Sequence, residues 1–268
     1  MESRTSKKRA EYQRIVSLTA SLTETLFAIG VGNRIVGVTD TCDFPDEAKE
    51  KPNVSCWFAP DLERLFALAP DLVLGLETAH AAIRSALESE GISVILVNPA
   101  TVEEALEVIA MLGVRLQAAE RAQTCIWNLR SRLAQLDTKV ARIPFSERHT
   151  VSRVLDIEND RFIVAGPLSF QYDVISRAGG RNVTGQIKET YPKVSFRQFR
   201  RWDPQMVFFC GYDRHFIPRF CADKKWRSLR AVQAGRVYQF DCALTCRTGP
   251  RILDMAELLF QTLYPEWA

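Results

Sequence analysis

Three of the seven cysteines lie in segments where their thiols could bind a soft metal ion. Cys242 and Cys246 are four residues apart, and Cys42 lies in a turn-rich segment that spans residues 39–45. Thiolate sulfur is a preferred ligand of Cu(I) and Zn²⁺. No Cys-x-x-Cys pair is present, and no histidine neighbours these cysteines. We therefore interpret all seven as reduced, mostly buried thiols, and predict neither a metal site nor a disulfide framework.

The sequence lacks the motifs that mark common catalytic sites. It contains no nucleophile elbow, no Walker loop, no His-Glu-x-x-His zinc motif and no Rossmann glycine string. Glu24 follows Ser21 by three residues, which is the spacing of a capping box at a helix N-terminus, so it is not interpreted as a general base. We predict a protein that is not an enzyme and carries no covalent cofactor.

Composition and charge exclude two further classes of function. Of the 268 residues, 47% are hydrophobic and 25% are charged, as in soluble globular proteins. The net charge is only +3 and the one basic cluster, Arg4 to Arg9, is terminal, so binding to nucleic acid is not predicted. No apolar run reaches the roughly 18 residues of a membrane-spanning helix.

The first residues bear on the expected compartment. Residues 1–9 are polar and basic and lead into a predicted strand, not into the apolar core of a signal peptide. We therefore expect a cytoplasmic protein, and a monomer. A periplasmic or lipid-anchored location is the alternative, if a signal sequence preceded this chain and was removed.

A long helix is predicted between residues 116 and 141, a stretch without glycine or proline that ends shortly before Pro144. Apolar residues recur in it at spacings of four and three, which places them in one stripe on a single helical face. The stripe consists of Ala122, Ile126, Leu129, Leu133, Leu136 and Val140. At 1.5 Å per residue the helix would be roughly 35–40 Å long, enough to link two domains.

Strands and helices alternate before this helix. Strands are expected at residues 14–18, 34–38, 72–75 and 93–97, and helices at residues 21–29, 60–68, 81–90 and 102–111. Such alternation predicts a parallel sheet that is covered by helices on both faces.

The sequence after the long helix repeats the sequence before it. Residues 161–164, followed by a predicted helix, mirror residues 14–17 and the first helix. Residues 62–74 also align without gaps to residues 196–208, and in both segments a proline ends a helix and precedes a strand. Two matches in the same order favour a pair of duplicated lobes.

We therefore predict an α/β protein with two lobes, each a mainly parallel sheet flanked by helices, and a ligand cleft between them. The N-terminal lobe would span residues 14–115, the linking helix residues 116–141 and the C-terminal lobe residues 145–268. Loops at the carboxyl ends of parallel strands are expected to contact the ligand. The candidate contacts on these loops are Thr41, Cys42, Trp57, Leu168, Ser169, Tyr191, Cys242 and Thr245.

Several motifs in this order resemble a known family. They are Arg14-Ile-Val-Ser-Leu, Cys42-Asp-Phe-Pro, Leu62-Glu-Arg-Leu and Gly249-Pro-Arg-Ile. They are similar to motifs of the helical-backbone metal receptors, or class III periplasmic binding proteins, and within that superfamily most similar to the cobalamin-binding proteins of ABC importers. The resemblance covers about residues 14–265.

The resemblance implies a substrate-binding protein that holds a corrinoid flat between its lobes by aromatic and apolar contact. Trp57 matches a tryptophan of the family's cleft, and Tyr191 stands where that family often has another aromatic residue. Large aromatic rings suit this role because each can bury about 150–250 Å² against a macrocycle. The aromatic residue usual before the family's Asp-aromatic-Pro turn is absent, since Thr41 and Cys42 occupy that loop.

Haem and ferric siderophores are the alternative ligands. A haem protein would offer histidine or tyrosine to the iron, but His80, His149 and His215 lie outside the candidate loops, on segments expected at the surface. A siderophore would favour several arginines, and only Arg247 and Arg251 lie near such a loop. A cytosolic corrinoid-handling or cofactor-processing protein without a standard importer is the remaining alternative.

The resemblance also implies an ABC permease as partner. Such binding proteins dock through one surface glutamate on each lobe, which meets arginines of the permease. Glu63, seven residues before Pro70, resembles the first of these, but the residue seven before Pro204 is Arg197. Because an arginine there would face like charge, we predict that the chain does not deliver ligand to a standard cobalamin permease.

Overall fold

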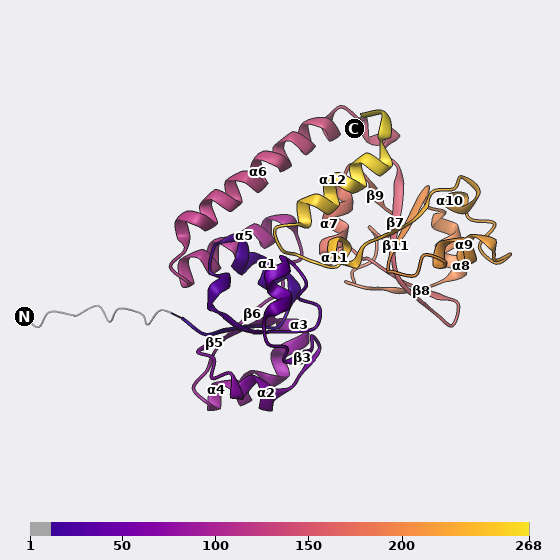
Figure 1. The fold of residues 1–268 in the computed structure, drawn as a ribbon. Helices are drawn as coiled ribbons and strands as arrows, with labels where there is room; N and C mark the ends of the chain where they lie inside the picture. The colour runs from indigo at the N-terminus through magenta and orange to yellow at the C-terminus, as the bar shows by residue number, and fades with distance from the viewer. Residues whose placement is uncertain (1–11, 268) are drawn as a thin grey trace, which may run out of the picture. The chain divides into compact units, whose positions relative to one another are not determined.

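The chain divides into two units, each with its own sheet (Figure 1). The structure, a computed structural model, describes residues 12–267, so the basic cluster at residues 4–9 lies outside the described residues. Unit 1 comprises the described residues up to Asn98 together with residues 107–126. Unit 2 comprises residues 99–106 and the described residues from Trp127 onward. The division falls within helices α5 and α6, so each unit contains part of both.

The long helix is confirmed as α6 (Ala119–Ala141), which follows α5 (Val102–Arg115). The six residues of its predicted apolar stripe are all buried, none more than 7% exposed. The helix starts later than predicted because Gln117 adopts a left-handed conformation with φ of 57°. The Ala118 N–H donates to the Gly113 carbonyl at 2.7 Å, so residues 116–118 form a turn between the two helices.

The sheet of unit 1 is parallel throughout, as predicted. Its strands lie in the order β2 (Ile35–Val38), β1 (Ile15–Ser17), β5 (Leu72–Leu76) and β6 (Ser93–Val97). The remaining elements of this unit are α1 (Ala20–Ala28), the hairpin strands β3 (Ser55–Cys56) and β4 (Ala59–Pro60), and the helices α2 (Leu62–Ala67), α3 (Glu77–His80) and α4 (Arg84–Ser89).

The core of unit 1 is aliphatic. Val16 and Val73 of the sheet pack with Leu65 of α2 and Leu87 of α4, and all four are fully buried. Near this core the predicted capping box is wrong. The N-cap of α1 is Thr19, whose side chain accepts from the Leu22 N–H at 3.5 Å, and Ser21 is already inside the helix.

The sheet of unit 2 has a parallel part and an antiparallel part. The parallel part contains β9 (Arg181–Asn182), β7 (Thr150–Glu158), β11 (Met206–Cys210) and β12 (Val237–Phe240). The antiparallel part adds β8 (Arg161–Val164) and β10 (Lys193–Ser195) to the far half of β7. The helices are α7 (Phe170–Arg177), α8 (Phe196–Trp202), α9 (Phe216–Ala222), α10 (Arg230–Gln233), α11 (Cys242–Thr245) and α12 (Ile252–Leu263).

The strand orders correct the predicted alignment of the two halves. In unit 1 the order is β2-β1-β5-β6, and the parallel part of unit 2 has the order β9-β7-β11-β12. The counterpart of β1 is therefore β7, whereas the sequence analysis had matched β1 to β8. β8 is the antiparallel return of a hairpin that the first half lacks. The gap-free match is confirmed, because it equates α2 and β5 with α8 and β11.

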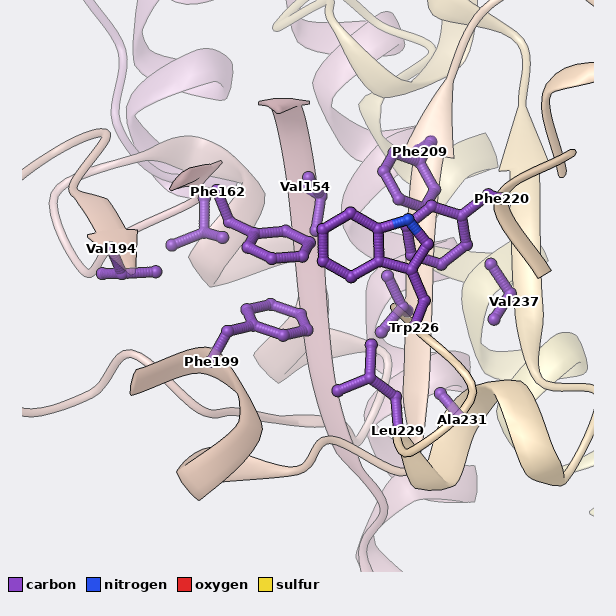
Figure 2. Packing of buried hydrophobic residues seen from close by; sticks show 12 residues of the cluster. Val154, Phe162, Val194, Phe199, Phe209, Phe220, Trp226, Leu229, Ala231 and Val237 are labelled. Carbon is purple, nitrogen blue, oxygen red and sulfur yellow. The ribbon is translucent and has the colours of Figure 1, made fainter. Parts of the chain in front are cut away.

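Unit 2 has an aromatic core. Figure 2 shows Trp226 with its indole directed toward Phe162 on one side and Phe220 on the other. The Phe162 and Phe199 rings are stacked with centroids 4.2 Å apart, and the Trp226 ring meets Phe162 edge-on at 5.2 Å. Phe199 comes from α8 and Phe162 from β8, so this core fixes the helix to the antiparallel part of the sheet.

Residues 12–267 contain no helix that combines the length and the hydropathy required to cross a bilayer.

Candidate functional site

Trp57 and Phe58 form the tip of a short hairpin in unit 1. The hairpin pairs β3 with β4 antiparallel, with Ser55 opposite Pro60 and Cys56 opposite Ala59. Trp57 is 39% exposed and Phe58 is 65% exposed, and their rings meet edge-on with centroids 5.9 Å apart. Both rings are therefore partly open to solvent, where a flat apolar ligand could stack on them.

His80 holds this hairpin tip in place. Its ring Nδ1 accepts a hydrogen bond from the Leu76 N–H at 2.9 Å, which leaves Nε2 to donate to the Trp57 carbonyl at 2.5 Å. The expectation that His80 lies on the surface is wrong, since the side chain is 1% exposed. Burial lowers the pKa of His80 below its ordinary value, which favours the neutral ring that this pair of bonds requires.

The loop that follows β2 carries two further predicted contacts. Thr41 is exposed, but Cys42 is only 4% exposed. The Thr23 hydroxyl lies 3.1 Å from the Cys42 sulfur, and the Thr39 hydroxyl lies 3.4 Å from it. Cys42 therefore fills a network of buried hydroxyls within unit 1. It belongs to a different unit from Cys242 and Cys246.

In unit 2 the predicted contacts Leu168 and Tyr191 lie on loops that pack against each other. The Gly166 N–H donates to the Thr190 carbonyl at 2.8 Å. A Cβ at Gly166 would lie 2.0 Å from the Glu189 carbonyl oxygen, so this approach requires glycine. Leu168 is 56% exposed and Tyr191 is 43% exposed, so these two loops present an apolar and an aromatic side chain.

Two polar residues near these loops have structural roles. Ser169 is buried and caps α7, accepting from the Tyr172 N–H at 3.3 Å while its hydroxyl donates to the Gly166 carbonyl. The Tyr191 hydroxyl donates to the Gln171 side-chain oxygen at 3.3 Å. Partial burial of its hydroxyl raises the pKa of Tyr191 above its ordinary value.

The predicted contact Cys242 lies in a cluster of three sulfurs. Cys210, Cys242 and Cys246 have sulfur atoms that all lie within 4.8 Å of one another. Hydrogen bonds from the thiols of Cys210 and Cys242 hold the pKa of Cys246 well below its usual range. Thr245, the last predicted contact, is 2% exposed, and its hydroxyl donates to the Asp241 carbonyl at 3.0 Å.

The cysteines as a group differ from the prediction of mostly buried thiols. All seven are free thiols. Cys42 is buried, Cys246 is exposed, and the other five are partly exposed. Among residues 12–267, Cys210, Cys242 and Cys246 form a group whose three sulfur atoms lie close enough together to hold a metal ion.

The predicted docking residues are both exposed, on corresponding helices. Glu63 lies in the first turn of α2, where its negative charge interacts favourably with the positive end of the helix dipole. Arg197 lies in the first turn of α8, and Arg200 and Arg201 on the same helix are also exposed. The surface of α8 is therefore basic where the corresponding surface of α2 carries a carboxylate.

Several residues that are prominent in the structure were not predicted from the sequence. Phe44 is 45% exposed, and together with Phe58 it adds to the aromatic surface of unit 1. Phe58 directly follows Trp57, which is a signal that a two-residue hairpin would expose both. Cys210 was missed because it ends a buried strand, 32 residues before Cys242, and only the pairing of β11 with β12 brings it near.

Comparison with known proteins reveals curated relatives along nearly the whole chain. The vitamin B12-binding protein of Salmonella typhimurium (strain LT2) is 30% identical over 252 residues, which cover 93% of this chain and 90% of the relative. An uncharacterized ABC transporter substrate-binding lipoprotein of Bacillus subtilis (strain 168) is 27% identical over 268 residues, which cover 96% of this chain and 82% of the relative.

Solved structures share the fold. The periplasmic vitamin B12-binding protein BtuF of Vibrio cholerae superposes with a TM-score of 0.81 at 26% identity, covering 95% of this chain and 97% of that chain. A periplasmic heme-binding protein from Pseudomonas aeruginosa gives a TM-score of 0.84 at 27% identity, covering 95% and 93%. These superpositions confirm the predicted α/β fold class.

The comparisons also overturn the expectation of a cytoplasmic protein. The sequence model of a family described as periplasmic binding protein matches residues 15–243, and the Bacillus relative is a lipoprotein. The cytoplasmic expectation rested only on where the chain begins, which does not determine the compartment. The alternative of a cytosolic corrinoid-handling protein falls with it. Because the match covers most of the sequence, the chain belongs to the periplasmic binding protein family.

Proposed function

We propose that the ligand of this ABC-importer substrate-binding protein is a corrinoid of the cobalamin class, which it binds and releases without chemical change. The observation that carries the proposal is the aromatic hairpin tip, where the rings of Trp57 and Phe58 are exposed and the Trp57 backbone is bonded to a buried histidine. The vitamin B12-binding protein of Salmonella typhimurium, 30% identical along most of the chain, supports the same class of ligand.

Each unit supplies its own contacts in this proposal. Trp57 and Phe58 of unit 1 offer ring surface, and Tyr191 and Leu168 of unit 2 offer an aromatic and an aliphatic side chain. A corrin ring has broad apolar faces and a polar rim. Stacked aromatic contact suits those faces, because each ring buries a large area and adds about 0.5–1.5 kcal/mol beyond the area term.

Haem is the second candidate, and one observation favours it. Tyr191 is 43% exposed, and a tyrosine oxygen can ligate haem iron, as in catalase. Ligation would require the tyrosinate form, and burial raises the pKa of Tyr191, which opposes it. His80 is committed to the Leu76 and Trp57 backbone and cannot serve as ligand without releasing the hairpin. These contacts favour a corrinoid over haem.

The proposal includes a permease as partner. Glu63 on α2 would meet a basic surface of the permease, while the basic face of α8 around Arg197 would require a different partner surface on the second side. Rim charges of this kind set partner choice and association rate more than total affinity.

Equilibrium dialysis against a panel of ligands tests the proposal. The panel contains cyanocobalamin, dicyanocobinamide, haemin and a ferric hydroxamate, each at the same concentration with the full chain. We expect the two corrinoids to bind and to be recovered unchanged. Retention of haemin or the hydroxamate, with both corrinoids remaining free, would overturn the assignment.

A further inference from the structure

Three thiols from separate segments of unit 2 meet at the carboxyl edge of its sheet. Cys210 is the last residue of β11, and it pairs in register with Phe240, the last residue of β12. The chain then turns at Asp241, which caps the single helical turn α11 by accepting from the Ala243 N–H at 2.7 Å. Adjacent strand ends therefore bring Cys210 beside the helical turn that carries Cys242.

The helical turn places the other two sulfurs on one face. The Cys246 N–H donates to the Cys242 carbonyl at 3.0 Å, so the two cysteines stand one helical turn apart. The Cys210 and Cys246 sulfurs lie 3.4 Å apart, and all three sulfurs lie within 4.8 Å of one another. Sulfur atoms in a metal centre have this kind of separation, since each would lie about 2.3 Å from a shared zinc ion.

A buried arginine makes the cluster suited to negative charge. Arg153 is 1% exposed, and its Nη2 lies 2.9 Å from the Cys210 sulfur and 3.9 Å from the Cys246 sulfur. Its Nη1 donates to the Val154 carbonyl and its Nε has no hydrogen-bond partner, and across residues 12–267 it forms no salt bridge with a carboxylate. A buried guanidinium without a counterion costs several kcal/mol. The thiolates of a metal-bound cluster would supply the missing negative charge next to this guanidinium.

We propose that Cys210, Cys242 and Cys246 form a binding site for one soft, thiophilic metal ion, of the class of Cu(I) and Zn²⁺. Thiolate donors select these ions over Mg²⁺ and Ca²⁺, which prefer oxygen ligands. Binding exchanges the thiol protons for sulfur–metal bonds and releases those protons to solvent, without oxidation or reduction. The site lies within unit 2 and does not depend on the corrinoid assignment.

The exposure of Cys246 leaves one side of the ion open. Cys210 and Cys242 are partly exposed and Cys246 is exposed, so the ion can enter without opening the core. Three protein ligands with an accessible fourth position also permit transfer of the ion to another thiol or ligand. A complex of three thiolates with Cu(I) or Zn²⁺ carries a net negative charge. The positive charge of Arg153 offsets part of it and so stabilises the complex.

Titration of the reduced, full chain with Cd²⁺ alone tests the site, because cadmium thiolates absorb in the ultraviolet by charge transfer from sulfur. We expect saturation at one ion per chain, and X-ray absorption of the Zn²⁺ form with three sulfur neighbours at about 2.3 Å. Loss of a hydrogen-bond partner of a metal ligand typically lowers metal affinity by roughly 10–100-fold. The Cys210→Ser and Cys246→Ser variants each lose a ligand itself, so their affinity for the ion should fall by more than that.

Cys221→Ser, a cysteine of α9 outside the cluster, is the matched control and should bind the ion like the wild type. Circular dichroism of each variant separates loss of a ligand from loss of fold, and Cys242→Ser provides a third independent test. Unchanged affinity in folded Cys210→Ser and Cys246→Ser would overturn the proposal.

A thiol count on the unreduced protein is a further test. A count of five instead of seven thiols would also overturn the proposal, because a disulfide within the cluster would then replace the metal site. No corrinoid is present, so failure here leaves the ligand proposal standing.

Discussion

The Nε2 atom of His80 lies 2.5 Å from the carbonyl oxygen of Trp57, and this bond joins a buried histidine to the exposed aromatic tip of a hairpin. The same ring accepts from the Leu76 N–H at the end of β5. His80 therefore connects the carboxyl end of a central strand to the backbone of the residue we propose as the main ligand contact. The position of Trp57 therefore depends on a residue whose own side chain is buried.

Replacing His80 with alanine should therefore weaken both the fold and the binding site. The partly buried Leu76 N–H and Trp57 carbonyl would lose their partner, and an unsatisfied polar group costs up to about 1–3 kcal/mol when it is buried. We expect the free energy of unfolding, measured with urea, to fall by about 2 kcal/mol or more. His215→Ala, an exposed histidine of unit 2, is the control and should change it little.

The same histidine makes stability depend on pH. Burial lowers the pKa of His80 in the folded state below its unfolded value of about 6.5. Its contribution to stability is then fully present above about pH 6.5 and is lost as pH falls through the lowered pKa of the folded protein. The difference in unfolding free energy between wild type and His80→Gln should shrink across that range. His149, whose pKa burial also lowers, is unchanged in this comparison. A difference independent of pH would contradict the account.

Trp57 itself should contribute strongly to corrinoid affinity. Loss of a stacked aromatic removes on the order of 1 kcal/mol beyond its buried area, which corresponds to at least about a fivefold weaker Kd. We expect this from calorimetric titration of Trp57→Ala with cyanocobalamin. Trp127→Ala, which removes another exposed tryptophan from α6, should bind like the wild type. Equal affinity in the two variants would remove Trp57 from the site.

The aromatic core of unit 2 should be sensitive to truncation. Phe199 is fully buried and stacks on Phe162, so Phe199→Ala should lower the free energy of unfolding by about 3–5 kcal/mol. Leu168→Ala, on an exposed loop of the same unit, should lower it by far less. Denaturant unfolding of the two variants side by side checks the difference, and a small effect at Phe199 would show that the core collapses around the gap.

Arg197 should control delivery to a permease that recognises two glutamates. With such a permease reconstituted in vesicles, we expect poor uptake from the wild type, because the basic face of α8 meets like charge. Arg197→Glu should raise uptake, whereas Arg214→Glu, the same charge change at another exposed site of unit 2, should not. Efficient uptake by the wild type would sink this part of the proposal.

The periodic parts of the fold were predictable, and the parts that carry local exceptions were not. The apolar stripe of α6 and the alternating elements of unit 1 follow from side-chain spacing alone, so their prediction is confirmed. Strand β7 was not predicted because a buried arginine, Arg153, interrupts its apolar pattern. The start of α6 was predicted too early because Gln117 adopts a left-handed conformation that normally favours glycine.

The candidate site was predictable only where it follows strand ends. Trp57, Leu168 and Tyr191 lie on loops that could be located from the strands, and all three are exposed. Whether a loop residue points outward is decided by contacts distant in sequence. Cys42 lies within a network of threonine hydroxyls, and Cys210 joins Cys242 and Cys246 only through strand pairing. Neither the surroundings of Cys42 nor the cluster of three sulfurs can be predicted from the order of residues alone.

Gel filtration of the full chain after incubation with cyanocobalamin tests the central claim most directly. The account predicts that the visible absorption of the corrinoid elutes with the protein at one ligand per chain, that the corrinoid is recovered unaltered, and that an equal concentration of haemin does not displace it. A protein peak without corrinoid absorption, or one that carries haem in its place, would contradict the account.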